Sequence, residues 1–208
     1  SLLGTILISD EGINGSISGN INNLEKFFSL MKRKLRIKKL SLKISNINFT
    51  PFSKSKIRIK KEIVSIGDRS IMPEKKTGKY IKPTKWDQVI TNKKYIVIDT
   101  RNNYEIKIGS FKNSINPNIK SFREFPRYIK DQKIDKEQHI AMFCTGGIRC
   151  EKASSYLISN GYKNVYQLDG GILNYFEFKK NKKKNSWKGE CFVFDKRVAV
   201  DGKLNRGS

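Results

Sequence analysis

Cys144 lies in the segment of this 208-residue sequence whose residue types are best suited to covalent chemistry. The cysteine follows a run typical of a buried strand, HIAMF, and begins a six-residue loop, CTGGIR, that leads directly into a helix. We expect Gly146 and Gly147 to turn backbone N–H groups inward, while the helix N-terminus and Arg149 add positive potential. These groups should lower the pKa of the Cys144 thiol below its usual value of about 8.5 and produce a nucleophilic thiolate.

The length of this loop discriminates between kinds of cysteine chemistry. A cysteine phosphatase of related shape needs one more residue between Cys and Arg to surround a phosphate, and position 150 is a second cysteine. The shorter loop is suited to hold the terminal sulfur of a persulfide, which favours sulfur transfer over phosphate hydrolysis. A buried structural cysteine is the alternative interpretation. We predict Cys144 as the catalytic residue, with an active-site loop of Thr145, Gly146, Gly147, Ile148 and Arg149.

The other cysteines and the single histidine do not complete a metal site. Three cysteines and one histidine cannot provide a usual four-ligand zinc site, a two-histidine iron site or a well-supported Cys–His pair. The sequence also lacks a dinucleotide-binding glycine motif. We therefore expect Cys150 and Cys191 to be structural, His139 to be an ordinary polar residue, and the protein to contain no metal and no flavin.

Strands and helices alternate on both sides of the loop. A helix with Trp86 precedes the strand YIVIDT, and the loop is followed by a helix, the strand VYQL, a DGG turn and a last helix. This order is typical of an α/β fold in which helices flank a parallel sheet. At the end of YIVIDT, Asp99 and Arg101, with Glu105 beyond them, are expected to support the loop through ion pairs.

The first 67 residues have a different, α+β pattern. Two short strands precede a helix that should run from an N-cap at Asn22 to about Lys34, and the segments LSLKI and KIRIKKEIVSI predict further strands. In the last of these, basic residues alternate with Ile57 and Ile59, which predicts a sheet with one basic and one apolar face. The basic residues of this strand are Lys56, Arg58 and Lys60.

Composition marks the boundaries between these parts. Residues 68–83 are polar and irregular, which predicts a linker between an α+β domain at 1–67 and an α/β domain at 84–180. Residues 181–208 form a basic tail that should end in a hairpin.

The sequence is strongly basic, with 43 Lys and Arg against 19 Asp and Glu and a formal net charge of +24. This charge favours a nucleic acid partner, although heavy use of Lys, Ile and Asn together also arises from biased codon usage. No apolar run is long enough to cross a bilayer, so we expect a soluble, cytoplasmic protein without membrane contact. We expect RNA to lie on a basic surface joining the two domains. Its candidate residues are Lys56, Arg58, Lys60, Lys179, Lys180, Lys182, Lys183 and Lys184.

Three separated motifs give the sequence a family resemblance. In this order, DEGINGSISG, CTGGIRCEKAS and GECFVFDKRVAV resemble the rhodanese-type tRNA uridine 5-hydroxylases, and YIVIDTRNNYEIKIGSFKNSIN, the active-site loop and LDGGI resemble a rhodanese domain. The resemblance implies a ferredoxin-like α+β domain followed by a rhodanese domain. It also implies oxygen-dependent conversion of the wobble uridine (position 34) of tRNA to 5-hydroxyuridine, with O₂ as co-substrate and Cys144 at the persulfide-forming position.

Three features distinguish the sequence from the family pattern. Family members carry a further strand and helix before the point where this sequence begins, and many have a cysteine-rich tail, so we expect an incomplete N-terminal sheet. Rhodanese domains commonly have Gly-His where this sequence has Gly109 and Ser110.

Three functions remain open on the sequence: tRNA hydroxylation, sulfur transfer through a Cys144 persulfide, and non-enzymatic RNA binding. The match of three motifs favours hydroxylation. Insertion of an oxygen atom from O₂ normally uses a metal or a flavin, and the sequence alone does not explain how a cysteine would serve instead.

Overall fold

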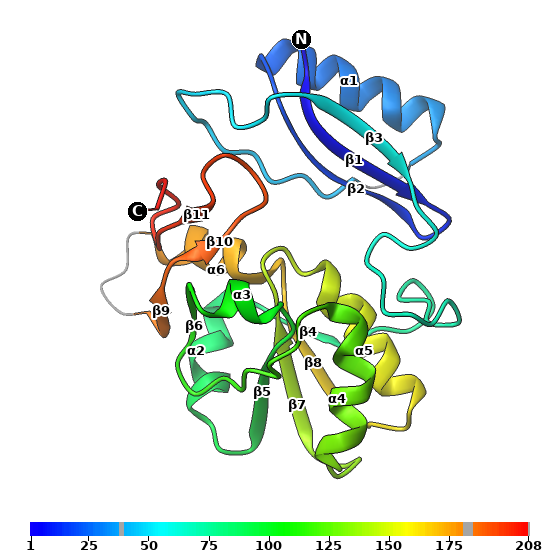
Figure 1. Cartoon of the computed structure of the whole chain (residues 1–208), viewed down its shortest axis with the longest axis vertical. Coiled ribbons are helices and arrows are strands. Elements are labelled where there is room, and N and C mark those ends of the chain that lie inside the picture. The colour runs from blue at the N-terminus through cyan, green and yellow to red at the C-terminus, as the bar shows by residue number, and fades with distance from the viewer. Residues whose placement is uncertain (38–39, 181–184, 208) are drawn as a thin grey trace. The chain divides into compact units, whose positions relative to one another are not determined.

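The structure is a computed structural model that describes residues 1–37, 40–180 and 185–207. The chain divides into two compact units, Ser1–Ile63 and Val64–Ser208. Figure 1 labels the helices and strands of both units.

The first unit contains a three-stranded sheet and one helix. In the sheet, β1 (Leu3–Ser9) pairs antiparallel with β2 (Gly12–Ser18) and parallel with β3 (Ser55–Ile59), which gives the order β2-β1-β3. The helix α1 (Ile21–Lys34) follows β2 in the chain (Figure 1). The predicted small α+β unit before the α/β domain is confirmed.

Three details of this unit differ from the prediction. The N-cap of α1 is Asn20, whose side chain accepts a hydrogen bond from the Asn22 N–H at 2.9 Å, so the helix begins earlier than predicted. The segment LSLKI, residues 40–44, forms no strand, because no described strand pairs with it. Ile57 and Ile59 are 68% and 87% exposed, so the apolar face of β3 is not buried in this unit.

A four-stranded parallel sheet forms the centre of the second unit. The strand order is β4-β8-β7-β5, and all three pairs of neighbours are parallel, which confirms the predicted sheet. After His139, the side chains of β7 alternate between the two core clusters, so residues 140–143 are all apolar, as expected for a sheet buried on both faces. The strands are β4 (Lys79–Ile81), β5 (Tyr95–Asp99), β7 (His139–Phe143) and β8 (Asn164–Leu168).

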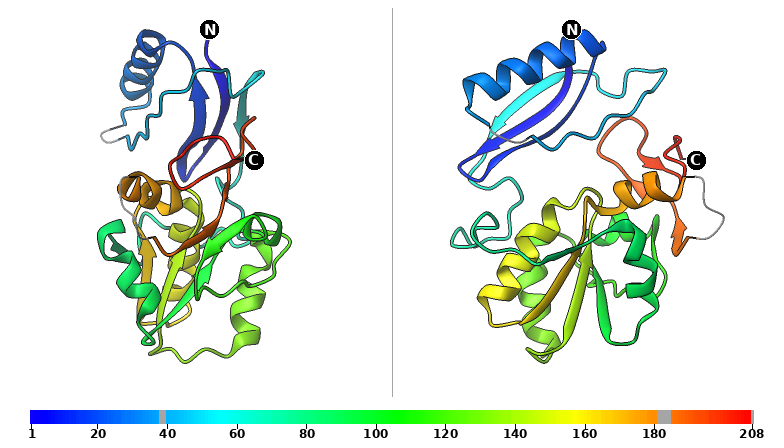
Figure 2. Two further views of the ribbon diagram at one scale, coloured as in Figure 1. Left: turned by 90° about the vertical axis from the view of Figure 1, so that its left-hand side faces the viewer. Right: turned by 180° about the vertical axis from the view of Figure 1, so that it is seen from behind.

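Helices cover both faces of this sheet, as the two views of Figure 2 show. On one face, α4 (Phe125–Gln132) and α5 (Ile148–Ser159) contribute side chains to a core cluster with β5, β7 and β8. On the other face, α2 (Pro83–Thr91) and α6 (Gly171–Lys179) form the second cluster with the same three strands.

Short elements complete the second unit. Among them β6 pairs antiparallel with β9, and β10 with β11, the latter in the tail for which a hairpin is predicted. The strand β4 lies within the predicted linker at 68–83, because a three-residue strand is too short to leave a recognisable pattern. No described helix is both long and apolar enough to cross a membrane. The short elements are α3 (Asn103–Ile106), β6 (Gly109–Phe111), the 3₁₀ helix η1 (Phe122–Glu124), β9 (Trp187–Gly189), β10 (Cys191–Phe192) and β11 (Ala199–Val200).

Candidate active site

Cys144 directly follows β7 at the carboxyl edge of the parallel sheet. The last residues of β5 and β7, Asp99 and Phe143, are paired, so the segments that follow these strands meet at one edge of the sheet. The N–H and hydroxyl groups of Thr100 both donate hydrogen bonds to the Phe143 carbonyl oxygen at 3.0 Å. Cys144 is therefore fixed beside the end of β5, and it is only 2% exposed.

The backbone after Cys144 binds its sulfur atom. Gly147 has a φ of 97°, and its N–H donates to Cys144 Sγ at 3.1 Å. The thiol and the N–H of Cys150 also hydrogen bond to this sulfur. Burial raises the pKa of the Cys144 thiol, but these hydrogen bonds and the Arg149 charge outweigh burial and lower the pKa from 9.0 to about 5. The arrangement therefore stabilises a thiolate at neutral pH.

The other loop residues lie in different surroundings. Thr145 is buried, and its carbonyl oxygen accepts a hydrogen bond from the Leu173 N–H at 3.1 Å. Gly146 is exposed, and a Cβ atom there would have no neighbour within 4 Å, so packing does not require glycine at this position. Because α5 begins at Ile148, the last two predicted loop residues belong to its first turn.

Arg149 and Glu105 form a bidentate ion pair. Arg149 Nη1 and Nη2 bind Glu105 Oε2 and Oε1 at 2.6 and 2.7 Å, and the two side chains are 11% and 0% exposed. Glu105 Oε2 also accepts a hydrogen bond from the Asn102 N–H at 3.1 Å, at the N-terminus of α3. Burial lowers the pKa of Arg149, but Glu105 outweighs burial and raises it, so the guanidinium stays charged near Cys144.

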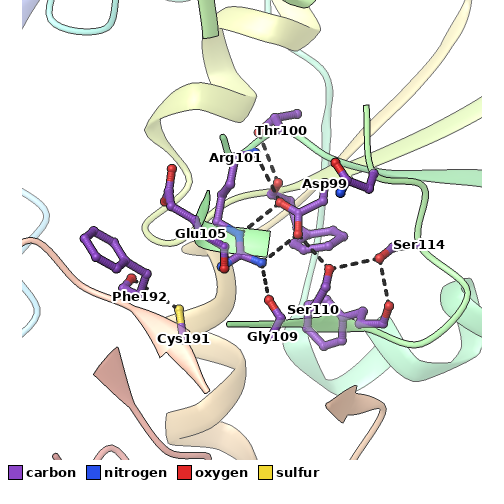
Figure 3. A network of polar contacts seen from close by, with 12 residues as sticks. Asp99, Thr100, Arg101, Glu105, Gly109, Ser110, Ser114, Cys191 and Phe192 are labelled. Atoms are coloured by element: carbon purple, nitrogen blue, oxygen red, sulfur yellow. Dashed lines mark hydrogen bonds and ion pairs between the residues drawn. The ribbon is translucent and has the colours of Figure 1, made fainter. Parts of the chain in front are cut away.

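Asp99 and Arg101 form a second buried ion pair, within the network of Figure 3. Arg101 Nη2 and Nε bind the Asp99 carboxylate at 2.7 and 2.9 Å, and both side chains are 0% exposed. Arg101 also donates to the Gly109 carbonyl oxygen at 2.6 Å, and the Ser110 hydroxyl donates to Asp99 at 2.7 Å. These bonds join the end of β5 to β6. Ser110 thus provides a hydrogen bond at the position where the resemblance would place a histidine.

The DGG turn, residues 169–171, leads into α6 and holds the active-site loop. The Ile172 N–H donates to the Cys144 carbonyl oxygen at 2.9 Å. Gly171 has a φ of 68°, and a Cβ atom there would lie 2.5 Å from the Cys144 oxygen and 2.7 Å from the Gly147 nitrogen. Only glycine permits this close approach. The sequence identifies the turn, but it does not show that the turn contacts the loop.

The two other cysteines are buried in different parts of the second unit. Cys150 Sγ lies 3.5 Å from the Thr100 hydroxyl and hydrogen bonds with Cys144, a contact that the sequence does not predict. Burial and the hydrogen bond with Cys144 raise the pKa of Cys150 well above 9.0. Cys191 Sγ donates to the Phe192 carbonyl oxygen at 3.6 Å, and burial raises its pKa to about 12.

His139 begins β7, whereas Cys144 follows its last residue, so the strand separates them. The imidazole packs against the rings of Tyr95 and Tyr166, with centroid distances of 5.5 and 5.7 Å. Within the described ranges, no group of three or more His, Cys, Asp or Glu side chains could hold a metal ion.

The candidate RNA-binding residues lie in several places. Lys180 is exposed after α6, but the Lys179 ammonium group binds the Asp87 carboxylate and is mostly buried, which reduces its availability to a phosphate. We call the exposed residues along and just after β3 the β3 basic row: Lys56, Arg58 and Lys60. Three further candidates lie outside the described residues: Lys182, Lys183 and Lys184.

An exposed aromatic cluster borders the site. Tyr104, next to Glu105, is 46% exposed, and Phe194 is 65% exposed. The Phe192 ring lies 5.3 Å from Tyr104 and 5.0 Å from Phe194 between centroids. We call these three residues the aromatic cluster. The sequence gives only a weak signal for this cluster, because the spacing of the two phenylalanines in CFVFD places them on one side of an extended segment but does not bring Tyr104 beside them.

Comparisons with known proteins cover both units. A family described as UPF0176 acylphosphatase like domain matches residues 1–63, and the rhodanese-like domain matches residues 82–177. A solved rhodanese-related protein from Thermoplasma volcanium is 29% identical and covers 48% of this chain and 92% of its own, with a TM-score of 0.41.

Two curated relatives match almost the whole chain. The tRNA uridine(34) hydroxylase of Legionella pneumophila (strain Paris) is 47% identical over 204 residues, which make up 98% of this chain and 80% of that protein. The tRNA uridine(34) hydroxylase of Wolbachia sp. subsp. Brugia malayi (strain TRS) is 49% identical over 203 residues, or 98% of this chain and 75% of that protein.

Proposed function

The chain belongs to the family of the tRNA uridine(34) hydroxylases, and from this membership we propose that it hydroxylates uridine 34 of tRNA, with Cys144 as the reactive group. The observation that carries the proposal is the identity of 47–49% with these enzymes over 98% of the chain. The activity is that of an oxidoreductase that modifies tRNA, with O₂ as co-substrate and 5-hydroxyuridine as product. The pKa of Cys144, lowered to about 5, supports a thiolate as the reactive group.

A thiolate is suited to activate a uracil ring. Carbon C6 of uracil is electrophilic because it is conjugated with the C4 carbonyl, and addition of the Cys144 thiolate there makes C5 electron-rich. We assign the attack on O₂ to this C5 atom, which forms a C5–O bond. A two-electron reductant then cleaves the O–O bond, which leaves a hydroxyl group on C5 and releases the second oxygen as water. Loss of the C5 proton and of the sulfur from C6 restores the ring double bond and releases the cysteine. The burial of Cys144 favours this sequence, because exclusion of water limits protonation of C5.

Other exposed residues of the chain are suited to hold the RNA. Single-stranded RNA loops are commonly bound by stacking of splayed bases on aromatic side chains, and we assign this role to the aromatic cluster for the bases that flank uridine 34. We assign phosphate contacts to the β3 basic row and to Lys180. Because the substrate is tRNA, we place the protein in the cytoplasm.

Mass spectrometry of digested tRNA tests the function. In cells that lack the gene, 5-hydroxyuridine derivatives should disappear from position 34, while thiolated nucleosides remain unchanged. The wild-type gene and the Cys191→Ser variant should restore the modification, whereas Cys144→Ser should not, because serine remains a neutral alcohol at neutral pH. Loss of thiolated nucleosides with normal 5-hydroxyuridine would instead support sulfur transfer and contradict the proposal.

A further inference from the structure

Cys150 is a buried thiol that the proposed chemistry leaves without a role. It lies in the first turn of α5 and is 0% exposed, and its thiol hydrogen bonds to the Cys144 sulfur. The Thr100 hydroxyl, which itself binds the Phe143 carbonyl oxygen, lies 3.5 Å from Cys150 Sγ and helps to fix its position. Cys144 and Cys150 thus lie in one buried core cluster, and Thr100 links the position of Cys150 to the end of β7.

The proposed reaction needs a source of two electrons. One oxygen atom of O₂ enters the uracil ring, and the other must be reduced to water. Two thiols that become one disulfide release two electrons, the number required.

We propose that Cys144 and Cys150 are a redox pair that supplies both electrons of each hydroxylation and ends each turnover as a disulfide. The inference rests on the proposed function and identifies the electron donor of the same site.

The steps balance in atoms and electrons. After C5 has bound O₂, the distal oxygen passes to the Cys150 sulfur, because Cys144 is still bonded to C6, and the O–O bond breaks, which leaves a hydroxyl group on C5 and a sulfenic acid. Loss of the C5 proton then restores the ring double bond and releases the Cys144 thiolate from C6. The other sulfur attacks the sulfenic sulfur, an S–S bond forms, and the oxygen leaves as water. In total, uridine, O₂, one thiolate, one thiol and one proton give 5-hydroxyuridine, water and one disulfide. A dithiol reductant then reopens the disulfide by thiol–disulfide exchange.

The ionisation of the two sulfurs is suited to this division of roles. Burial and the neighbouring Cys144 sulfur raise the pKa of Cys150, so one member of the pair is a thiolate while the other stays protonated. When Cys144 bonds to carbon or oxygen, its negative charge disappears, and a main cause of the raised pKa of Cys150 disappears with it. Cys150 then becomes easier to ionise at the stage when a second nucleophile is needed.

A single-turnover experiment tests the pair directly. Protein reduced and desalted without oxygen is mixed with excess tRNA that lacks the modification, and air is admitted with no added reductant. We expect about one 5-hydroxyuridine per protein and the loss of two titratable thiols. Trypsin cleaves after Arg149, so the peptides 137–149 and 150–152 should remain joined only through the new disulfide. The Cys150→Ala variant should form at least tenfold less product, whereas Cys191→Ala should match the wild type.

The outcomes separate the two proposals. Wild-type product formed while all three thiols stay reduced would overturn the redox pair and leave the proposed function intact. One equivalent of product from Cys150→Ala without added reductant would do the same. If the wild type forms no product even with added dithiothreitol, the proposed function is itself contradicted, and the redox pair with it.

Discussion

The rate at which Cys144 reacts with iodoacetamide should be almost independent of pH between 6 and 8. Its surroundings lower the pKa from 9.0 to about 5, so about 99% of the thiol is ionised at pH 7, against about 1% for an unperturbed group. A thiol with the ordinary pKa would react about tenfold faster for each pH unit over this range. For Cys144 the rate should instead decrease only when the pH falls toward 5.

Peptide mass spectrometry measures this rate for each cysteine separately. Cys150 and Cys191 provide internal controls, because burial raises the pKa of both thiols and should keep them unreactive below pH 8. A tenfold rise per pH unit at Cys144, with a midpoint near 9, would refute the argument that its surroundings stabilise the thiolate.

A double variant separates the charge of Arg149 from the hydrogen bonds. Arg149→Gln alone would leave the buried Glu105 carboxylate without its partner, so Glu105→Gln is combined with it. The pKa of Cys144 should rise, because a positive charge is lost, but it should stay below 9.0, because the Gly147 and Cys150 hydrogen bonds remain. An unchanged midpoint would mean that the guanidinium does not contribute.

Three further predictions concern stability, packing and RNA binding. Folding lowers the pKa of Cys144 from 9.0 to about 5, so the contribution of the thiolate to stability decreases as the pH falls between these values and is lost below the folded value. Between pH 6 and 8, the free energy of unfolding of the wild type should therefore rise by about 1.4 kcal/mol per pH unit relative to Cys144→Ser. Urea unfolding measures this difference, and parallel curves for the two proteins would contradict it. Gly171→Ala should destabilise the protein by about 3 kcal/mol in the same assay and slow the alkylation of Cys144, whereas Gly161→Ala, with a positive φ but no close neighbour, should cost about 1 kcal/mol. Alanine at all three positions of the β3 basic row should reduce the slope of log affinity for tRNA against log salt by about 2, and an unchanged slope would exclude these contacts.

The sequence predicts the thiolate well because the groups that stabilise it are close to Cys144 in the chain. Gly147 and Arg149 follow the cysteine within five residues, so a strand, a tight loop and a helix start are sufficient to place them. The position of Cys150 relative to Cys144 is harder to predict. It depends on α5 beginning at Ile148 rather than after Arg149, which a sequence pattern does not define.

The parts that the sequence did not reveal depend on residues distant in the chain. Gly171 approaches the Cys144 carbonyl because α6 follows β8, which pairs with β7. The segment at 40–44 shows the opposite error, because alternating apolar residues predict a strand only where a neighbouring strand is available to pair with it. Local sequence patterns thus predict the reactive thiolate, whereas the contacts that support the loop from α6 can be predicted only when the order of the strands in the sheet is known.

The strand order also determines when the reactive sulfur can arise during synthesis. In the sheet β8 lies between β4 and β7, although it comes last of the four in the chain. A ribosome-bound chain that ends before Asn164 has neither this strand nor the Ile172 N–H that binds the Cys144 carbonyl oxygen. Until then the active-site loop lacks the support that α6 provides, and we expect Cys144 to reach its final position only when the domain closes around it.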